Sequence, residues 1–228
     1  MNNLIKAVKT GNKSLLLDLI DRGIELETSN EQGTTALMIA AATGDLAIAK
    51  LLLENGVDLH TKNDEGKTAL VNACIEGHQK MVRLLIDYGA EVNARFHKGQ
   101  TPLMIASANG NDHTVKILIE EHADINAQDN QGWTALMNAA QFGHLPIVKM
   151  LVKEGAAINS KDNMGWTALL LAISQKDTIL VRYLINHGAD MNANNEFGLS
   201  ALMLAGYYKY KEILKILLDH EARIDLTS

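Results

Sequence analysis

The chain has 228 residues, a formal net charge of −6 and only 4% aromatic residues. Lysine and arginine form no dense run, so the sequence lacks the basic footprint that binding to nucleic-acid phosphates requires. No apolar run approaches the length of a membrane span, and the N-terminal residues lack the apolar core of a secretory signal. We therefore expect a cytoplasmic protein with neither a nucleic-acid nor a membrane partner.

The strongest signal in the sequence is a period of 33 residues. An alanine column from Ala40 to Ala205 and a leucine column from Leu52 to Leu217 keep this step. A glycine keeps it as well, at Gly33, Gly66, Gly99, Gly132, Gly165 and Gly198. A fixed period of this length predicts one supersecondary unit copied along the chain, with a continuous core between stacked copies.

Residues 129–161 illustrate the predicted unit. A turn that ends at a repeating glycine precedes Thr134, which is placed to cap a short first helix. Gly143 is expected to end that helix in a left-handed conformation, and Pro146 lies in the first turn of a second helix that Gly155 ends. Both helices are too short to be stable alone, so neighbouring units must hold them.

A polar column recurs in the connector that leads from one unit to the next. It consists of Asn93, Asn126, Asn159 and Asn192. Loop amides that are shielded from water need hydrogen-bond partners. We expect these side chains to bond to loop backbone between repeats.

The units resemble the repeats of the ankyrin family. Thr101, Pro102 and Leu103 match the Thr-Pro-Leu signature of that family, and Gly143 with His144 matches its inter-helix Gly-His pair. The resemblance covers essentially the whole chain and implies an all-α solenoid of paired antiparallel helices with projecting hairpin loops. Apolar residues, mostly methionine, replace the histidine that usually follows the signature, in a style similar to many bacterial members.

The register predicts a single domain, 1–228, that contains seven units. These are an N-cap repeat at 1–29, repeats at 30–62, 63–95, 96–128, 129–161 and 162–194, and a C-cap repeat at 195–228. Lys176 and Lys209 replace the inter-helix glycine of the last two units, and His122 and Glu221 replace the glycine after a second helix. If the two lysine positions require left-handed backbone, each substitution costs about 1 kcal/mol.

The sequence offers little for catalysis. Its eight histidines form no metal-ligand motif, and no phosphate-binding loop occurs. The single cysteine, Cys74, follows the repeating alanine, where we expect a small buried residue rather than a reactive thiol. We predict no enzyme activity, catalytic residue, cofactor or metal site. An enzyme or small-ligand protein would instead need a deep, closed pocket.

The resemblance implies that partners bind the hollow formed by the hairpin tips and the exposed side of the first helices. Aromatic and large apolar residues gather at these positions in the last three repeats. The candidate partner-binding residues are Trp133, Phe142, Met164, Trp166, Phe197, Leu199, Tyr207 and Tyr208. Because tryptophan and tyrosine dominate binding hot spots, we predict a scaffold that binds a partner protein or peptide on its concave face. The acidic early repeats would steer a basic region of that partner.

Three alternatives remain open at this point. Trp133 and Trp166 could stack on each other across adjacent hairpins, and Tyr207, Tyr208 and Tyr210 could cap the final repeat. The chain could also be a structural or regulatory subunit that binds through its ends or its convex face. We expect it to be monomeric on its own, and to act in the host cytosol if it is a bacterial effector.

Overall fold

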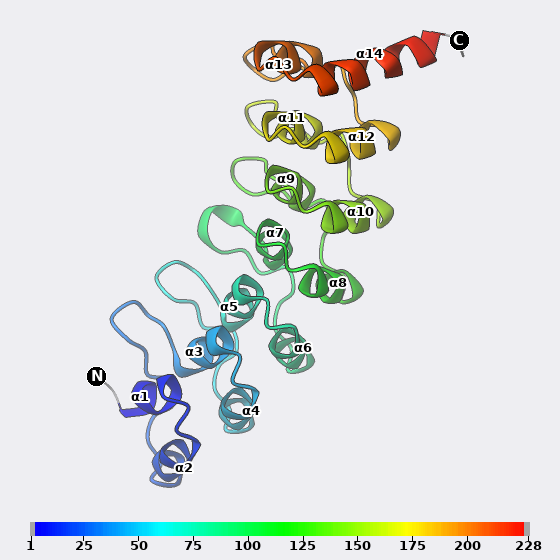
Figure 1. Cartoon of the computed structure of the whole chain (residues 1–228). Coiled ribbons are helices and arrows are strands. Elements are labelled where there is room, and N and C mark those ends of the chain that lie inside the picture. Colours follow the sequence, from blue (N-terminus) through cyan, green and yellow to red (C-terminus); the bar gives the residue numbers. More distant parts are fainter. Residues whose placement is uncertain (1–2, 226–228) are drawn as a thin grey trace. The chain divides into compact units, whose positions relative to one another are not determined.

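A computed structural model describes residues 3–225, in which short helices follow one another in pairs (Figure 1). The pairs are α1 (Asn3–Lys9) and α2 (Lys13–Asp21), α3 (Ala36–Thr43) and α4 (Leu46–Glu54), α5 (Ala69–Glu76) and α6 (Gln79–Asp87), α7 (Pro102–Ala108) and α8 (Asp112–Glu120), α9 (Ala135–Gln141) and α10 (Leu145–Lys153), α11 (Ala168–Ser174) and α12 (Thr178–Asn186), and α13 (Ala201–Tyr207) and α14 (Lys211–Asp225). A short 3-10 turn, η1 (His97–Gly99), precedes α7. The predicted all-α fold and its repeating helix pairs are confirmed.

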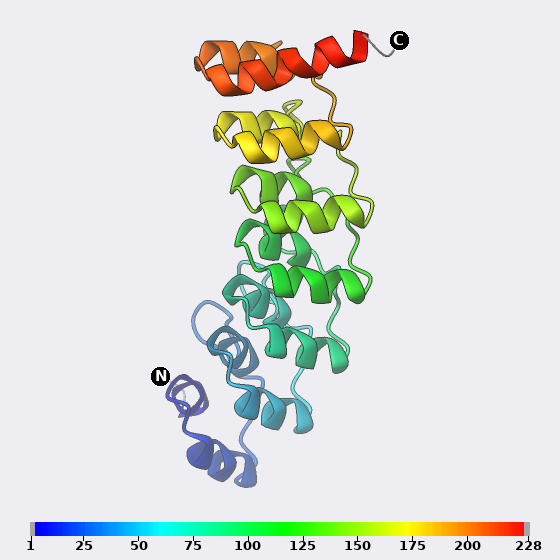
Figure 2. The same cartoon turned by 45° about the vertical axis from the view of Figure 1, so that its right-hand side comes forward.

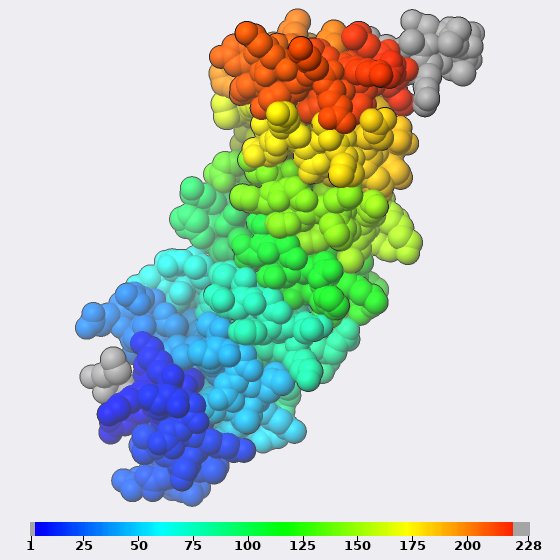
Figure 3. All heavy atoms as spheres, in the orientation of Figure 1, coloured from blue at the N-terminus to red at the C-terminus, as the bar shows by residue number. Residues whose placement is uncertain are grey.

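Internal contacts divide the chain into two compact units, residues 1–124 and 125–228. In the first unit, α1, α3, α5 and α7 pack in sequence as one layer, and α4, α6 and α8 pack beside them as the other. In the second unit, α9 packs on α11 and α11 on α13, while α12 and α14 lie side by side (Figure 2). Successive repeats within each unit form contiguous bands of atoms (Figure 3).

A hydroxyl side chain caps every first helix after α1. Its oxygen accepts a hydrogen bond from the backbone N–H three residues further on, as Thr134 does from Met137 at 3.2 Å. The other caps are Thr35, Thr68, Thr101, Thr167 and Ser200. The alanine column from Ala40 to Ala205 is fully buried, because its small side chains let neighbouring first helices approach closely.

The inter-helix turns use left-handed backbone, as the glycine pattern predicted. Gly143 has a φ of 72°. Lys176 and Lys209 hold the same conformation with φ of 58° and 57°, and His122 has a φ of 61°. Both lysines therefore carry the conformational cost that was expected for a side chain in this region.

One aspartate or asparagine closes most of the hairpin loops. Asp162 Oδ1 accepts hydrogen bonds from the N–H groups of Met164 and Trp166, at 2.9 and 2.8 Å. Asn30, Asn63, Asp129 and Asn195 close their loops in the same way. Adjacent hairpins are also joined through backbone, since Glu196 N–H donates to the Met164 carbonyl at 2.9 Å.

The fourth hairpin departs from this pattern. Phe96 replaces the closing aspartate or asparagine and is buried, with an exposed fraction of 8%. The loop then forms η1, with Lys98 in left-handed backbone at a φ of 56°. A buried ring therefore takes the place of the closing carboxylate or amide, and the Arg95 guanidinium donates a hydrogen bond across the loop to the Gly99 carbonyl at 3.0 Å.

The polar column of the connectors makes the predicted bonds between repeats. Asn93 Oδ1 accepts from Asp124 N–H and Asn126 Oδ1 accepts from Ala157 N–H, both at 2.8 Å. Asn159 repeats this arrangement. For Asn192, the corresponding partner falls after residue 220, outside the side chains that the structure describes.

The last helix does not end where the others do. Each of the six earlier second helices has nine residues, whereas α14 has 15 and continues to Asp225. The usual glycine is replaced by Glu221, so the chain continues as helix at the point where other repeats turn into their connector.

Candidate protein-binding face

All eight candidate partner-binding residues lie in the second unit. We call this set the aromatic face: Trp133, Phe142, Met164, Trp166, Phe197, Leu199, Tyr207 and Tyr208. Five of them are exposed, namely Tyr207 at 78%, Phe197 at 64%, Phe142 at 59%, and Met164 and Tyr208 at 45% each. The remaining three, Trp133, Trp166 and Leu199, are half-buried.

The hairpin loops position five of these residues. Met164 and Phe197 directly precede the repeating glycine, and Trp166 and Leu199 directly follow it. Their backbone N–H groups are held by the closing side chain of the same loop. Trp133 is held likewise by Asp129. Each side chain is therefore presented from a backbone that is already fixed.

The ends of two first helices supply the other three residues. Phe142 follows α9, and its ring centroid lies 6.4 Å from that of His144. Tyr207 and Tyr208 end α13, with their rings edge to face at 5.1 Å. Tyr208 also stacks on Tyr210 at 5.3 Å. One sequence alternative gave these three tyrosines the role of a cap on the final repeat. In the structure their rings form a cluster, and Tyr207 remains mostly in contact with solvent.

A second sequence alternative, a stack of Trp133 on Trp166, is not found. Among the ring pairs of the described residues, neither indole is paired with the other. Both residues are half-buried. Part of each residue's surface therefore remains available, and the hairpin backbone beneath holds it in place.

The asymmetry between the two halves of the chain extends beyond the aromatic face. Among side chains described in residues 3–124, Leu17 and Tyr88 are the exposed large apolar ones, at 40% and 42%. The side chains described in residues 125–220 include four further examples outside the aromatic face. These are Ile179, Leu202, Met203 and Leu218. Sequence reasoning missed them, although Leu202 and Met203 occupy columns that a following repeat would normally cover.

The early repeats carry the expected negative charge at their hairpins and helix ends. Glu31, Asp64, Glu65 and Glu76 are exposed. Lys67 Nζ lies 2.6 Å from Glu65 and lowers the pKa of that carboxyl through a hydrogen bond and its positive charge. The pair is locally neutral, so the other three carboxylates carry the negative field of this surface.

The described residues can be compared with the requirements for a metal site and a reactive thiol. No group of three or more histidine, cysteine or acidic side chains there is placed to hold a metal ion. Cys74 is fully buried, and burial raises the pKa of its thiol. The predicted burial of this cysteine is confirmed. Among the described residues, no helix combines the length and apolar character that crossing a bilayer requires.

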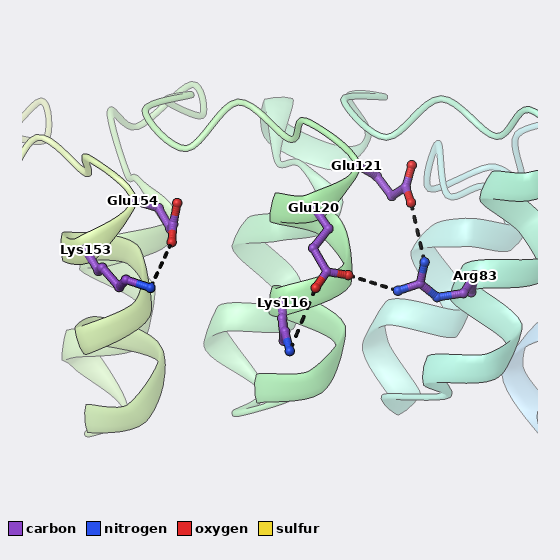
Figure 4. Close-up of polar contacts among 6 residues, drawn as sticks. All are labelled: Arg83, Lys116, Glu120, Glu121, Lys153 and Glu154. Carbon is purple, nitrogen blue, oxygen red and sulfur yellow. Dashed lines mark hydrogen bonds and ion pairs between the residues drawn. The ribbon is translucent and has the colours of Figure 1, made fainter.

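An open groove of about 270 Å³ lies between α6 and α8 and is lined mainly by charged side chains. Arg83 occupies its wall and pairs with Glu120 at 3.0 Å and Glu121 at 3.5 Å (Figure 4). Lys116 approaches Glu120 at 3.8 Å. These ion pairs are solvent-exposed, so each contributes about 0–1 kcal/mol. They link neighbouring second helices.

Repeated helix pairs, closed hairpins and an exposed apolar surface define a helical-repeat protein. The family model of ankyrin repeats matches three stretches, residues 4–96, 95–162 and 154–228. The chain therefore belongs to the ankyrin-repeat family. Ankyrin repeats are general modules of protein–protein interaction, and proteins built from them are typically scaffolds without enzyme activity.

Solved ankyrin domains share the fold. The ankyrin repeat domain of Bcl-3, described as a unique member of the IκB protein family, is 29% identical with a TM-score of 0.82. That match covers 95% of this chain and 98% of the Bcl-3 chain. The ankyrin repeat domain of human ASB11 is 27% identical with a TM-score of 0.87, and the match covers 96% of this chain and 98% of the ASB11 chain. The comparison with curated protein sequences gave no match.

Proposed function

We propose that this chain is a protein-binding scaffold whose partner, a protein or an extended peptide, docks on the aromatic face, the concave side of the predicted solenoid. The observation that supports this most directly is the exposure of Phe142, Phe197 and Tyr207 in a chain with so few aromatic residues. Contiguous exposed apolar surface on soluble proteins usually marks an interaction site. Aromatic anchors at such sites supply much of the binding free energy.

The preformed loops favour binding further. The hairpins of Asp129, Asp162 and Asn195 are each closed by two side-chain hydrogen bonds to backbone. A partner therefore does not have to order these loops when it binds, which lowers the entropic cost of association. Trp133 and Trp166 are half-buried, and partial burial already restricts their side chains before a partner binds.

The partner suited to this surface has two properties. It presents apolar or aromatic side chains to Met164, Phe197 and the tyrosine cluster. It also carries a basic region, because the exposed carboxylates of the early repeats would accelerate its approach. The steering term weakens as salt increases, since exposed charges are screened beyond about 8 Å at physiological ionic strength.

A pair of exposed substitutions tests the proposal without disturbing the core. Phe142→Ser with Phe197→Ser removes two aromatic anchors, and Ile179→Ser removes an apolar side chain that is 67% exposed but lies outside the aromatic face. A partner captured by the unmodified chain is purified and titrated against all three proteins. Each hot-spot residue is expected to contribute about 2 kcal/mol, or roughly 30-fold in affinity. Equal affinities for all three proteins would refute the proposal.

The tryptophans need a separate experiment because they are half-buried. Trp133→Ala combined with Trp166→Ala should abolish binding while the cooperative unfolding transition stays largely intact. Loss of that transition would assign both residues a structural role. Binding through an end of the chain, the other possibility from the sequence, has its own supporting observation in the exposed Leu202 and Met203 of α13.

A further inference from the structure

The outer side of the last repeat is apolar. Leu202 is 38% exposed, Met203 58% and Leu218 52%. We call this surface the end face, and it consists of Leu202, Met203, Gly206 and Leu218. Stacked repeats bury such side chains against the next repeat, whereas here they are exposed.

The end face is the surface through which earlier repeats stack. Leu136 and Met137 hold the same register in α9, are 2% and 1% exposed, and belong to a helix that packs on α11. Leu169 and Leu170 of α11, which packs on α13, are 1% exposed each. In α13, the equivalent pair continues an established helix–helix interface but has no covering helix within the described residues.

Gly206 is a second, independent observation at the same place. The equivalent positions Ala41, Cys74, Ala140 and Ile173 are all fully buried, whereas Gly206 is exposed. A Cβ atom added at Gly206 would meet nothing within 4 Å, and its φ is not positive. The fold therefore gives no reason for a glycine here, where glycine destabilises a helix relative to alanine. A glycine on an open helix face does allow another helix backbone to approach closely.

A head-to-tail contact between two copies fits the end face poorly. The opposite end of the chain is polar, because Lys6 is exposed where Ile39 and Leu171 are buried. A head-to-tail contact would thus bury a lysine against leucine and methionine.

We propose that the end face binds the end face of a second copy of this chain, with α13 of one copy against α13 of the other around a two-fold axis. Such a contact is self-complementary, so each copy buries the same apolar residues. The exposed charges of α14 have both signs, as in Lys211, Glu212, Lys215 and Asp219. Because both signs are present, two copies that meet at this surface do not repel each other through a uniform charge. The proposal is independent of the aromatic face and replaces the monomer that the sequence predicted.

Sedimentation equilibrium of the purified chain over a range of concentrations tests the proposal. We expect a monomer–dimer equilibrium with a micromolar dissociation constant that stops at two copies. Met203→Lys should weaken the dimer at least tenfold, and Ile179→Lys, at an equally exposed apolar position outside the end face, should leave it unchanged. A monomer at all concentrations, growth beyond dimers, or a dimer that survives Met203→Lys would overturn the proposal.

Gly206→Ala tests whether the two α13 backbones approach each other closely or whether the dimer depends only on burial of apolar side chains. Alanine should raise the melting temperature of the monomer, because it removes a helix glycine and has free space for its methyl group. The same substitution should weaken the dimer several-fold, because the methyl group separates the two α13 backbones. A dimer that is unchanged or tighter with Gly206→Ala would overturn the proposed contact.

A disulfide tests the two-fold geometry. Met203→Cys introduces an accessible thiol, while the native Cys74 is buried. A mild oxidant such as diamide should convert this variant to a covalent dimer faster than it converts an Ile179→Cys control. Equal rates would contradict the arrangement. The variant with both Phe142→Ser and Phe197→Ser should dimerise normally. The proposals for the aromatic face and for the end face are therefore tested independently.

Discussion

The side-chain amide of Asn159 bonds to the backbone of the following repeat on both sides of a turn. Its Oδ1 accepts a hydrogen bond from Asp190 N–H at 2.8 Å, and its Nδ2 donates to the Gly188 carbonyl at 3.0 Å. The two partners flank Ala189, which is 8% exposed. One asparagine side chain thus provides hydrogen-bond partners for a backbone N–H group and a backbone carbonyl group in the connector of the next repeat.

Asn159→Ala should lower the free energy of unfolding by about 1 kcal/mol, because both bonds are lost at a site that water can partly reach. Urea unfolding followed by circular dichroism measures the change. Asn130→Ala is the matched control, since its side chain lies on a hairpin tip and closes no loop. Equal stabilities for the two variants would show that the connector bonds contribute nothing.

Lys209→Gly should stabilise the protein by about 1 kcal/mol, because glycine adopts left-handed backbone without the steric cost that a Cβ atom brings. Lys176→Gly should gain less. The Lys176 ammonium lies 5.5 Å from the centroid of the Tyr210 ring, and an exposed contact of this type contributes about 0.5–1 kcal/mol. Thermal unfolding of both variants gives the comparison, and a larger gain for Lys176→Gly would contradict this reasoning.

Most of the fold could be predicted from the sequence because the same residue types recur at the same positions in successive repeats. Thr134 as a cap, Gly143 as a left-handed turn and Asn159 as a connector bond were all predicted from their register, and all three are confirmed. The fourth hairpin could not be predicted in the same way. A buried Phe96 in place of a closing aspartate gives a loop with no counterpart elsewhere in the sequence.

The sequence predicted which residues belong to the candidate site, but it did not predict how exposed each of them is. The register identified which side chains belong to hairpin tips and helix ends. The half-burial of Trp133 and Trp166 depends on how closely the next loop approaches, and Figure 1 shows these loops projecting one above another in the second unit. The exposure of Leu202 and Met203 depends on whether another helix covers α13. The residues at the same register in earlier repeats are similar, so the sequence alone does not show which of them are covered.

Gly165→Ala tests how tightly successive hairpins pack. Its φ is 74°, and a Cβ atom there would lie 2.8 Å from the Cα atom of Asn195. Gly198 occupies the same column with a φ of 72° but has nothing within 4 Å of such an atom. Gly198→Ala should cost about 1 kcal/mol from backbone strain alone, and Gly165→Ala clearly more. Similar losses in urea unfolding would argue against tight hairpin contact.

Cys74 should make stability depend on pH in the alkaline range. Burial raises the pKa of its thiol above the ordinary value of 9.0. The folded chain therefore keeps a proton that the unfolded chain releases. Below pH 9.0 the two states bind this proton equally, and above it stability falls by up to about 1.4 kcal/mol per pH unit.

The measurement is urea unfolding of the unmodified chain and of Cys74→Ala at several pH values from neutral to alkaline. Only the difference between the two proteins reports on the thiol, because lysines and tyrosines also titrate in this range. The alanine variant should lose less stability as the pH rises. Parallel pH profiles would mean that the thiol ionises without unfolding, and hence that water reaches Cys74 in the native chain.

The closed hairpins also bear on how recognition by this chain can change. In the loop between Asp162 and Trp166, the carboxylate and the glycine determine the backbone path, while Met164 contributes only its side chain to the surface. A mutation at such a tip alters what the loop touches without altering its shape. Selection, or an engineer with a small library of tip residues, can therefore rewrite specificity one loop at a time at little risk to folding.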